Sequence, residues 1–339
     1  MFCTSVTLDQ ALGESRDPEG KGVKAVTIAG NIDSMNRDQA KETAHISVCI
    51  CTYKRPLLLK RLLTELSRQG TGGLFTYSIV VADNDEAKSA EVTVAEMREV
   101  CGVPVKYCVE PRRNIALARN KAVENAEGEY IALIDDDEFP EPMWLLTLFK
   151  ICNEYKVDGV LGPVKRHFDE APPAWFKKSS IYDRRTNPTG KLVDWKEART
   201  GNVLLKRQVI AGETAPFRFQ FRAGEDQEFF RRKTEEGYVF IWSSDAVVSE
   251  TIPPARWKRS YILRKAALQG ATAALQPNCG VINIMKSVIA VPLYVIILPF
   301  ALLLGQHLFM ALMVKICDHS GKLLMLMGIN PIHEEYVSD

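Results

Sequence analysis

The sequence predicts an α/β domain built on a doubly wound, mostly parallel β-sheet. Between residues 45 and 275, apolar β-branched segments alternate with amphipathic ones, which is typical of β–α–β units. Several of these apolar segments end in polar residues, and open parallel sheets bind their ligands at such strand ends. The chain has 339 residues, of which 46% are apolar and 25% charged, so it can bury a substantial core.

The elements follow one another in a regular order. Strands are expected at residues 45–53 (HISVCICTY), 77–85 (YSIVVADND), 104–110 (PVKYCVE) and 130–138 (YIALIDDDE). Helices are expected between them, at residues 56–66, 92–100 and 114–126. The first helix opens at Pro56 and the third closes at Gly128. Three of the four strands therefore end in polar residues at what should be one edge of the sheet.

Charge, cysteine and histidine usage exclude several classes of function. The 43 basic and 42 acidic residues nearly cancel, which argues against a nucleic-acid partner. No CxxC, HExxH, GxSxG, Walker A or GxGxxG motif occurs among the residues. Cys49 and Cys51 lie two apart in the first strand, so we expect both to be buried on one face and free of disulfides. Carboxylates are left to carry any chemistry.

Two acidic clusters are candidates for that chemistry. Asp135, Asp136 and Asp137 follow the fourth strand, and three adjacent carboxylates favour a hard divalent cation such as Mg²⁺ or Mn²⁺. The cluster Ala-Gly-Glu-Asp-Gln-Glu at 223–228 is consistent with an acidic first turn of a helix, a general base, or both. At the second strand end, Asp83 is either a contact for a base or ribose, or a turn-forming aspartate.

The two ends of the chain differ from its middle. Residues 1–44 are polar and lack the pattern of a secretory signal, so we expect a flexible tail. Residues 276–339 should associate with a membrane, because the 28 residues between Lys286 and Lys315 include no Asp, Glu, Lys or Arg. The alternative for this apolar run, 287–314, is a buried core helix.

The form of the membrane contact stays open in the sequence. Pro292 and Pro299 should kink a helix, and Gly305 interrupts the run, which allows one tilted span or a re-entrant hairpin. Basic residues crowd the approach to the run and predict a catalytic domain on the cytoplasmic side of an inner membrane. They are Arg256, Lys258, Arg259, Arg264, Lys265 and Lys286.

Seven motifs, in this order, resemble family 2 glycosyltransferases of the GT-A fold, and within them the succinoglycan-type bacterial exopolysaccharide glucosyltransferases. They are ICTYKRP, VVADND, NIALARN, LIDDDE, VLGPV, RTGNVLLKR and GEDQEFF, spread over roughly residues 46–275. The resemblance implies an inverting transfer of a sugar from a nucleotide-sugar donor, with UDP-glucose favoured. It also implies an acceptor hydroxyl on a lipid-linked oligosaccharide of bacterial polysaccharide biosynthesis.

The resemblance also implies roles for individual residues. Asp226 would be the catalytic base, with Glu225 beside it, and Asp135 and Asp137 would bind the divalent cation. The nucleotide-sugar site would comprise Thr52, Tyr53, Arg55, Asp83, Asp85, Arg119, Asp135 and Asp136. The acceptor side would comprise Trp195, Thr200, Gly201 and Asn202, although a core role for Trp195 is equally open. Many relatives carry a late histidine near the metal where this chain has Ser249, which leaves the full set of metal ligands open.

Two other functions compete with this one. A sugar nucleotidyltransferase would share the nucleotide-binding sheet, but it needs a glycine-rich loop after the first strand, and CTYKRP has no glycine. A non-catalytic assembly partner would keep the fold and lose activity, yet this chain retains both acidic clusters.

Overall fold

The computed structural model describes residues 43–220, 224–274 and 280–329. Of the predicted tail, residues 1–42 lie outside this range, and Ala44 already begins the first strand.

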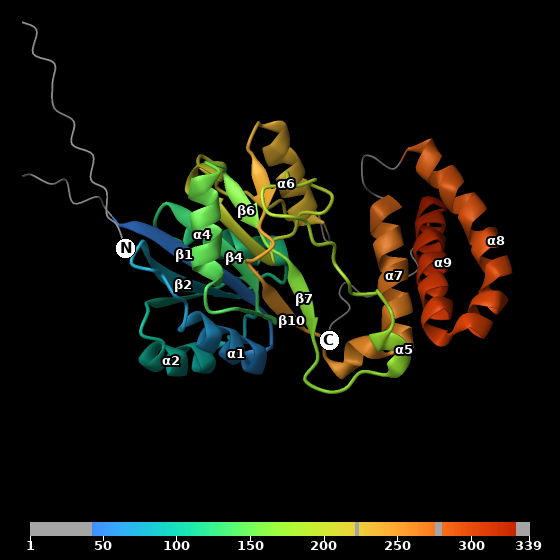
Figure 1. The fold of residues 1–339 in the computed structure, drawn as a ribbon, viewed down its shortest axis with the longest axis horizontal. Helices are drawn as coiled ribbons and strands as arrows, with labels where there is room; N and C mark the ends of the chain where they lie inside the picture. Colours follow the sequence, from blue (N-terminus) through green and yellow to red (C-terminus); the bar gives the residue numbers. More distant parts are fainter. Residues whose placement is uncertain (1–42, 221–223, 275–279, 330–339) are drawn as a thin grey trace, which may run out of the picture. The chain divides into compact units, whose positions relative to one another are not determined.

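Seven strands form the main sheet, in the order β3-β2-β1-β4-β8-β6-β9 (Figure 1). Neighbouring strands are parallel except at β8, which is antiparallel to both β4 and β6. The sheet is therefore mostly parallel, as predicted. The strands are β1 (Ala44–Thr52), β2 (Phe75–Asp83), β3 (Val105–Val109), β4 (Tyr130–Asp135), β6 (Gly159–Leu161), β8 (Asn202–Lys206) and β9 (Phe240–Trp242).

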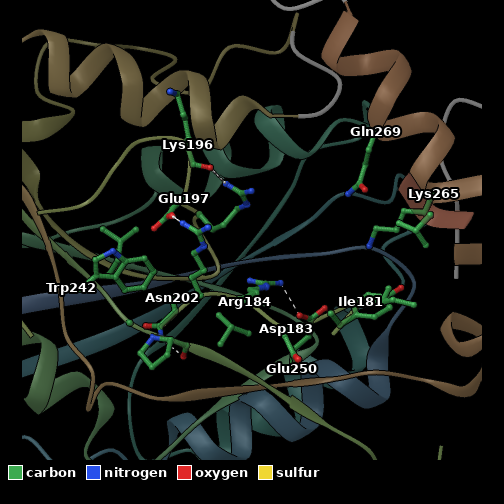
Figure 2. Close-up of a pocket in the computed structure, with 18 of the residues that line it drawn as sticks. Ile181, Asp183, Arg184, Lys196, Glu197, Asn202, Trp242, Glu250, Lys265 and Gln269 are labelled. Carbon is green, nitrogen blue, oxygen red and sulfur yellow. Dashed lines mark hydrogen bonds and ion pairs between the residues drawn. The ribbon is translucent and has the colours of Figure 1, made fainter. Parts of the chain in front are cut away.

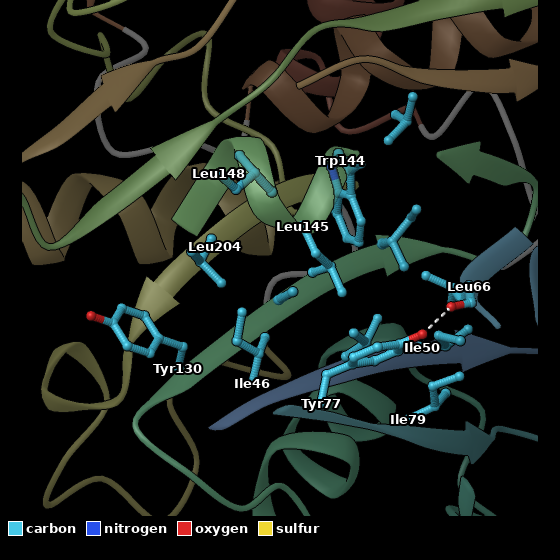
Figure 3. Close-up of a cluster of buried hydrophobic side chains, with 14 of the residues drawn as sticks. Ile46, Ile50, Leu66, Tyr77, Ile79, Tyr130, Trp144, Leu145, Leu148 and Leu204 are labelled. Carbon is cyan, nitrogen blue, oxygen red and sulfur yellow. Dashed lines mark hydrogen bonds between the residues drawn. The ribbon is translucent and has the colours of Figure 1, made fainter. Parts of the chain in front are cut away.

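Helices cover both faces of this sheet, which confirms that it is doubly wound. Alternate residues of β1 divide between two apolar cores: Ile46, Val48 and Ile50 pack in one, and Cys49 packs in the other. The first core contains side chains of α1, α2 and α4, and Trp144 and Leu145 of α4 lie over the sheet in Figure 3. The second contains side chains of α3 and α6. The helices are α1 (Pro56–Leu66), α2 (Glu91–Val100), α3 (Ile115–Glu124), α4 (Trp144–Glu154) and α6 (Glu225–Glu235).

The cysteines of the described ranges are free, as the sequence predicts. Cys49 is buried, whereas Cys51, one step from the strand end, is only partly buried. The prediction that both are buried is therefore confirmed for Cys49 and met only in part for Cys51.

A small second sheet, in the order β5-β10-β7, flanks the carboxyl end of β4. Strand β10 (Val248–Thr251) is antiparallel to β5 (Glu138–Pro140) and parallel to β7 (Val164–His167). This register places Glu250 directly opposite Glu138. Short helical segments complete the domain at α5 (Ala174–Lys177), η1 (Arg207–Val209) and η2 (Pro254–Trp257).

Three helices form the C-terminal region: α7 (Arg259–Ala274), α8 (Val281–Leu304) and α9 (Gln306–Leu326). The chain reverses at Gly305, because Ser287 near the start of α8 bonds His319 near the end of α9 at 2.9 Å. The run 287–314 is therefore a helical hairpin, not one continuous span. Pro292 and Pro299 lie inside α8 without ending it.

The hairpin packs on α7 through small residues. A Cβ on Gly270 of α7 would lie 1.8 Å from the carbonyl oxygen of Asp318, so only glycine allows the two backbones this close. Aromatic and aliphatic side chains join α7 to the catalytic domain, with Phe176 and Trp257 at the centre of that cluster.

Helix α8 is the one helix of the described ranges that is long and apolar enough to cross a membrane. Only 11% of its most apolar window is buried inside the protein, which rules against the buried core helix. Its outward side chains are large and apolar, including Ile296, Phe300 and Leu303.

Candidate active site

The strand ends converge as predicted. Thr52 at the end of β1 lies opposite Asp83 of β2, and Cys51 lies opposite Asp135 of β4. Parallel pairing without a register offset therefore brings three polar strand ends to one edge of the sheet.

Asp136 is fixed inside this edge by two of the predicted residues. The Thr52 hydroxyl donates to one carboxylate oxygen at 2.8 Å, and Arg55 donates to the other at 3.0 Å. Burial raises the pKa of Asp136 to about 7, against the opposing effect of the Arg55 charge. Asp136 therefore ties β1 to the loop after β4.

Asp83 and Asp85 differ in how their oxygens are used. Asp83 is fully buried and accepts hydrogen bonds from the backbone of Asp85 and Ala90 and from the Tyr107 hydroxyl. Burial raises the pKa of Asp83, and these donors oppose the rise. The Oδ2 of Asp85 is buried and has no hydrogen-bond partner in the structure. Asp83 builds the turn, and Asp85 is the one of the two that retains an oxygen for a ligand.

Tyr53 follows β1 and is partly buried. The Arg113 guanidinium lies 4.6 Å from the centre of its ring, from the loop before α3. The residues after β1 and those after β3 therefore meet over the same strand ends.

Arg119 connects the two acidic clusters of the sequence. It projects from α3, is 7% exposed, and forms ion pairs with Glu225 and with Asp135, the latter at 3.5 Å. One guanidinium thereby holds the first turn of α6 beside the end of β4. Burial raises the pKa of Glu225, and the Arg119 charge opposes that rise.

Asp226 is the neighbour of Glu225 on α6, and Gly224 precedes both in a left-handed conformation that starts the helix. The Arg199 Nε lies 3.8 Å from one Asp226 oxygen, and the other accepts the backbone N–H of Gln227. The side chain is 15% exposed, so it is oriented by the protein and still open to a reactant.

The two predicted metal ligands differ in access. The Asp135 side chain is 39% exposed, whereas Asp137 is buried and paired with Arg256 at 3.0 Å and Arg55 at 3.4 Å. No preassembled group of three or more metal-ligating side chains occurs in the described ranges. Mg²⁺ and Mn²⁺ in phosphate-binding sites commonly use one or two carboxylates and complete their shell with substrate and water, so the residues fit such an ion.

A further acidic residue lies beside them. Glu138 is 2% exposed, and its Oε1 is buried without a hydrogen-bond partner. Burial raises its pKa well above the ordinary value, and Asp135 raises it further. Arg184 lies between the facing carboxylates, 2.7 Å from Glu250 and 3.8 Å from Glu138.

Sequence reasoning missed Glu138, Arg184 and Arg256 as members of the site. Glu138 directly follows the aspartate triplet, which was the available signal. Arg184 comes from a loop and Arg256 from the short helix η2, both far along the chain, and no local pattern marks them.

The residues predicted for the acceptor side fall into two groups. Gly201 lies against the carboxylates, since a Cβ there would be 2.6 Å from Glu138 and 3.0 Å from Asp135. Thr200 is buried, with an unpartnered hydroxyl. The Asn202 amide instead bonds Trp144, Pro163 and Ala246, which joins β8 to its surroundings. Trp195 packs against the second apolar core.

Comparison with known families identifies this arrangement. The model of the glycosyl transferase family 2 matches residues 47–224, more than half of the chain. The chain belongs to glycosyl transferase family 2. Its transferase domain is thus of the GT-A type.

The chain is also similar to individual known proteins. The chain is 29% identical over 233 residues to the succinoglycan biosynthesis protein ExoM of Rhizobium meliloti, covering 68% of this chain and 74% of that protein. It is 24% identical to the chondroitin synthase of Escherichia coli over 62% of this chain, but this spans only 35% of the synthase.

Solved structures share the fold. The mannosyltransferase PcManGT of Pyrobaculum calidifontis, in complex with GDP-Man and Mn²⁺, has a TM-score of 0.58 and 17% identity. The match covers 85% of this chain and 88% of that one, so the likeness extends through most of the transferase.

Proposed function

We propose that this family 2 glycosyltransferase moves glucose from UDP-glucose, with inversion, to a hydroxyl of a lipid-linked oligosaccharide in bacterial polysaccharide biosynthesis. The reaction would take place on the cytoplasmic side of the inner membrane. The similarity to ExoM supports the polysaccharide pathway, and the donor and acceptor are our own assignments.

The double ion pair of Arg119 is the observation that carries this proposal. Through Glu225 and Asp135, it fixes the α6 turn with Asp226 beside the end of β4, which would face the donor diphosphate. Asp226 would deprotonate the acceptor hydroxyl, which then attacks the anomeric carbon from the side opposite the nucleotide. An in-line attack requires that Asp226 and the end of β4 be held at a fixed separation, and the Arg119 ion pairs would provide this.

On the donor side, the predicted residues have separate tasks. Thr52, Tyr53 and Arg55 would line the nucleotide pocket, and Asp85 would accept a hydrogen bond from the base or ribose. Asp135 and Asp137 would hold Mg²⁺ or Mn²⁺, which supplies charge stabilisation for the departing diphosphate. The Mn²⁺ in the mannosyltransferase complex supports this cofactor.

A lipid-linked acceptor is consistent with the C-terminal hairpin. Helix α8 exposes apolar side chains along its length, and 24 residues are enough to reach through the hydrocarbon core. The acceptor lipid stays in the bilayer, so an enzyme held at the surface meets it directly.

A donor screen tests the proposal. Full-length protein in bacterial membranes is incubated with individual nucleotide sugars, and nucleotide release and pyrophosphate release are followed separately. We expect release of UDP from UDP-glucose that stops in excess EDTA. Pyrophosphate release would indicate nucleotidyl transfer, and consumption of no nucleotide sugar would indicate a non-catalytic partner.

A further inference from the structure

A cavity of about 560 Å³ lies between the transferase domain and the C-terminal helices (Figure 2). Its walls come from the ends of β6, β8 and β9, the loop that contains residues 181–199, α7, and Val314 of α9. The volume is in the range of small-molecule binding sites. None of the α7 or α9 residues in this wall belongs to the donor site described above.

The lining mixes apolar and charged side chains, and basic residues outnumber acidic ones among the charged. Five basic side chains face three acidic ones. Two of the acids are engaged by arginines within the lining, Glu250 by Arg184 at 2.7 Å and Glu197 by Arg185 at 2.9 Å. The third, Asp183, is engaged from outside by Arg166 at 2.7 Å. Lys196, Arg199 and Lys265 also line the cavity, so its charged side chains carry a net positive charge, which favours an anionic ligand.

The cavity extends from the neighbourhood of Asp226 to helix α7. At one end, Arg199 lies 3.8 Å from Asp226, the proposed base. At the other end, Lys265 and Gln269 extend from α7 toward the cavity in Figure 2. Lys265 also lies close enough to Glu250 to lower the pKa of that carboxylate, although burial, the larger effect, raises it. The α7 end therefore belongs to the same electrostatic network as the strand-end carboxylates.

Helix α7 is also the element on which the hairpin packs. Gly270, one residue beyond Gln269, is in backbone contact with α9. A ligand that enters beside α7 thus has its anionic part at Lys265 and any lipid part beside the hairpin.

We propose that this cavity binds the phosphate-bearing headgroup of a lipid-linked acceptor, with Lys265 and Gln269 at the phosphate and Arg199 at the sugar end near Asp226. The assignment rests on the proposed function, since it concerns the acceptor of the same reaction. Lysine suits a phosphate group as a compact, multiply donating charge, and glutamine adds a neutral donor.

Binding to vesicles tests this without relying on turnover. Full-length protein is titrated with phosphatidylcholine vesicles, with and without a polyprenyl diphosphate, and inorganic pyrophosphate is added as a soluble competitor. We expect the wild type to bind the diphosphate vesicles more tightly than the plain vesicles. Lys265→Gln should reduce this gain in affinity about tenfold, because it removes one charge-assisted hydrogen bond. Lys265→Arg, which keeps the charge, should retain most of the gain.

Lys258→Gln is the matched control, because Lys258 is exposed at the start of the same helix and does not line the cavity. It should bind as the wild type does. Equal binding of wild type and Lys265→Gln would overturn the assignment. Competition by pyrophosphate without any gain from the diphosphate lipid would also overturn it, because the site would then take a free anion.

Measurements with the donor distinguish a failure of the cavity assignment from a failure of the proposed function. Lys265→Gln should leave the KM for UDP-glucose unchanged and raise the KM for the acceptor. If the wild type binds diphosphate vesicles but no nucleotide sugar, the proposed function fails and the cavity assignment stands.

Discussion

Folded proteins usually expose charged side chains and bury apolar ones, and two regions of this molecule reverse that distribution. The strand-end site buries charged side chains, whereas helix α8 exposes apolar ones. At the site, Asp136, Glu138 and Glu225 are each less than 10% exposed. On α8, Ile296 is 66% exposed and Leu303 is 86% exposed. Buried charges and exposed apolar surface are the two informative exceptions in a soluble fold. In the first case arginines of the same chain offset the buried charges, whereas in the second only 11% of the most apolar window is buried inside the protein.

The two regions also differ in how the chain stabilises them. The buried carboxylates are held by arginines from distant segments: Arg55, Arg119, Arg184 and Arg256. Burying such pairs costs desolvation energy that their attraction only partly offsets. Helix α8 has its polar contacts on the side facing α9, where Lys315 lies over the Tyr294 ring. Its exposed side chains, such as Ile296, Phe300 and Leu303, are large and apolar.

The largest expected effect is at the catalytic base. Asp226→Asn should lower kcat by about 10²–10⁴-fold, because it removes general base catalysis while keeping the shape of the side chain. The affinity for UDP-glucose, measured by calorimetry, should change less than threefold. Turnover within tenfold of the wild type would remove Asp226 from this role.

Next is the buried ion pair that joins the two acidic clusters. Arg119→Met should lower the free energy of unfolding by about 3–5 kcal/mol, since Glu225 would stay buried without its partner. Urea unfolding of the full-length protein in detergent measures this. Arg112→Met is the control, because the Arg112 side chain is 74% exposed, and it should change stability little. A similar loss in both variants would contradict the account.

The exposed face of α8 provides the third comparison. Ile296→Asp should shift protein from the membrane fraction to the soluble fraction, since an aspartate at a helix centre costs about 2.5–3.5 kcal/mol in a bilayer. Val100→Asp, at an equally exposed apolar site on α2, should leave the distribution unchanged. Sedimentation of cell lysates measures both, and equal behaviour of the two variants would show that α8 has no special contact with lipid.

The smallest expected effect is at the nucleotide site. Asp85→Asn should raise the KM for UDP-glucose about tenfold through the loss of one hydrogen bond to a charged acceptor, with kcat nearly unchanged. Glu86→Gln is the neighbouring exposed control. An unchanged KM for Asp85→Asn would show that the unpartnered oxygen of Asp85 does not meet the donor.

Local patterns predicted much of the fold. Strands β1 to β4 and helices α1 to α3 lie where apolar periodicity places them, and the parallel register brings Thr52, Asp83 and Asp135 to one edge. The short strands β5, β7 and β10 could not be predicted in this way, because three or four residues carry no readable period. Their pairing depends on contacts between distant segments, as in the register of Glu138 with Glu250.

The site was predictable to a similar extent. The acidic triplet at the fourth strand end pointed to Asp135 and Asp137, the acidic helix start pointed to Asp226, and their roles stay predictions. The sequence favoured a cation as the neutralising charge at the triplet, whereas the structure places Arg55 and Arg256 on Asp136 and Asp137. Arginines that reach a site from remote loops leave no spacing signal. The sequence also allowed either one tilted span or a hairpin at Gly305, and the contact of Ser287 in α8 with His319 in α9 shows that the two helices pair.

The most direct test of the account is a transfer assay in membranes that contain the lipid-linked acceptor. Full-length protein is supplied with UDP-glucose labelled in the sugar, and label is counted in the organic-solvent extract. The account predicts metal-dependent labelling of the lipid extract by the wild type and none by Asp226→Asn. Label that stays in water-soluble products, or equal labelling by both proteins, would contradict it.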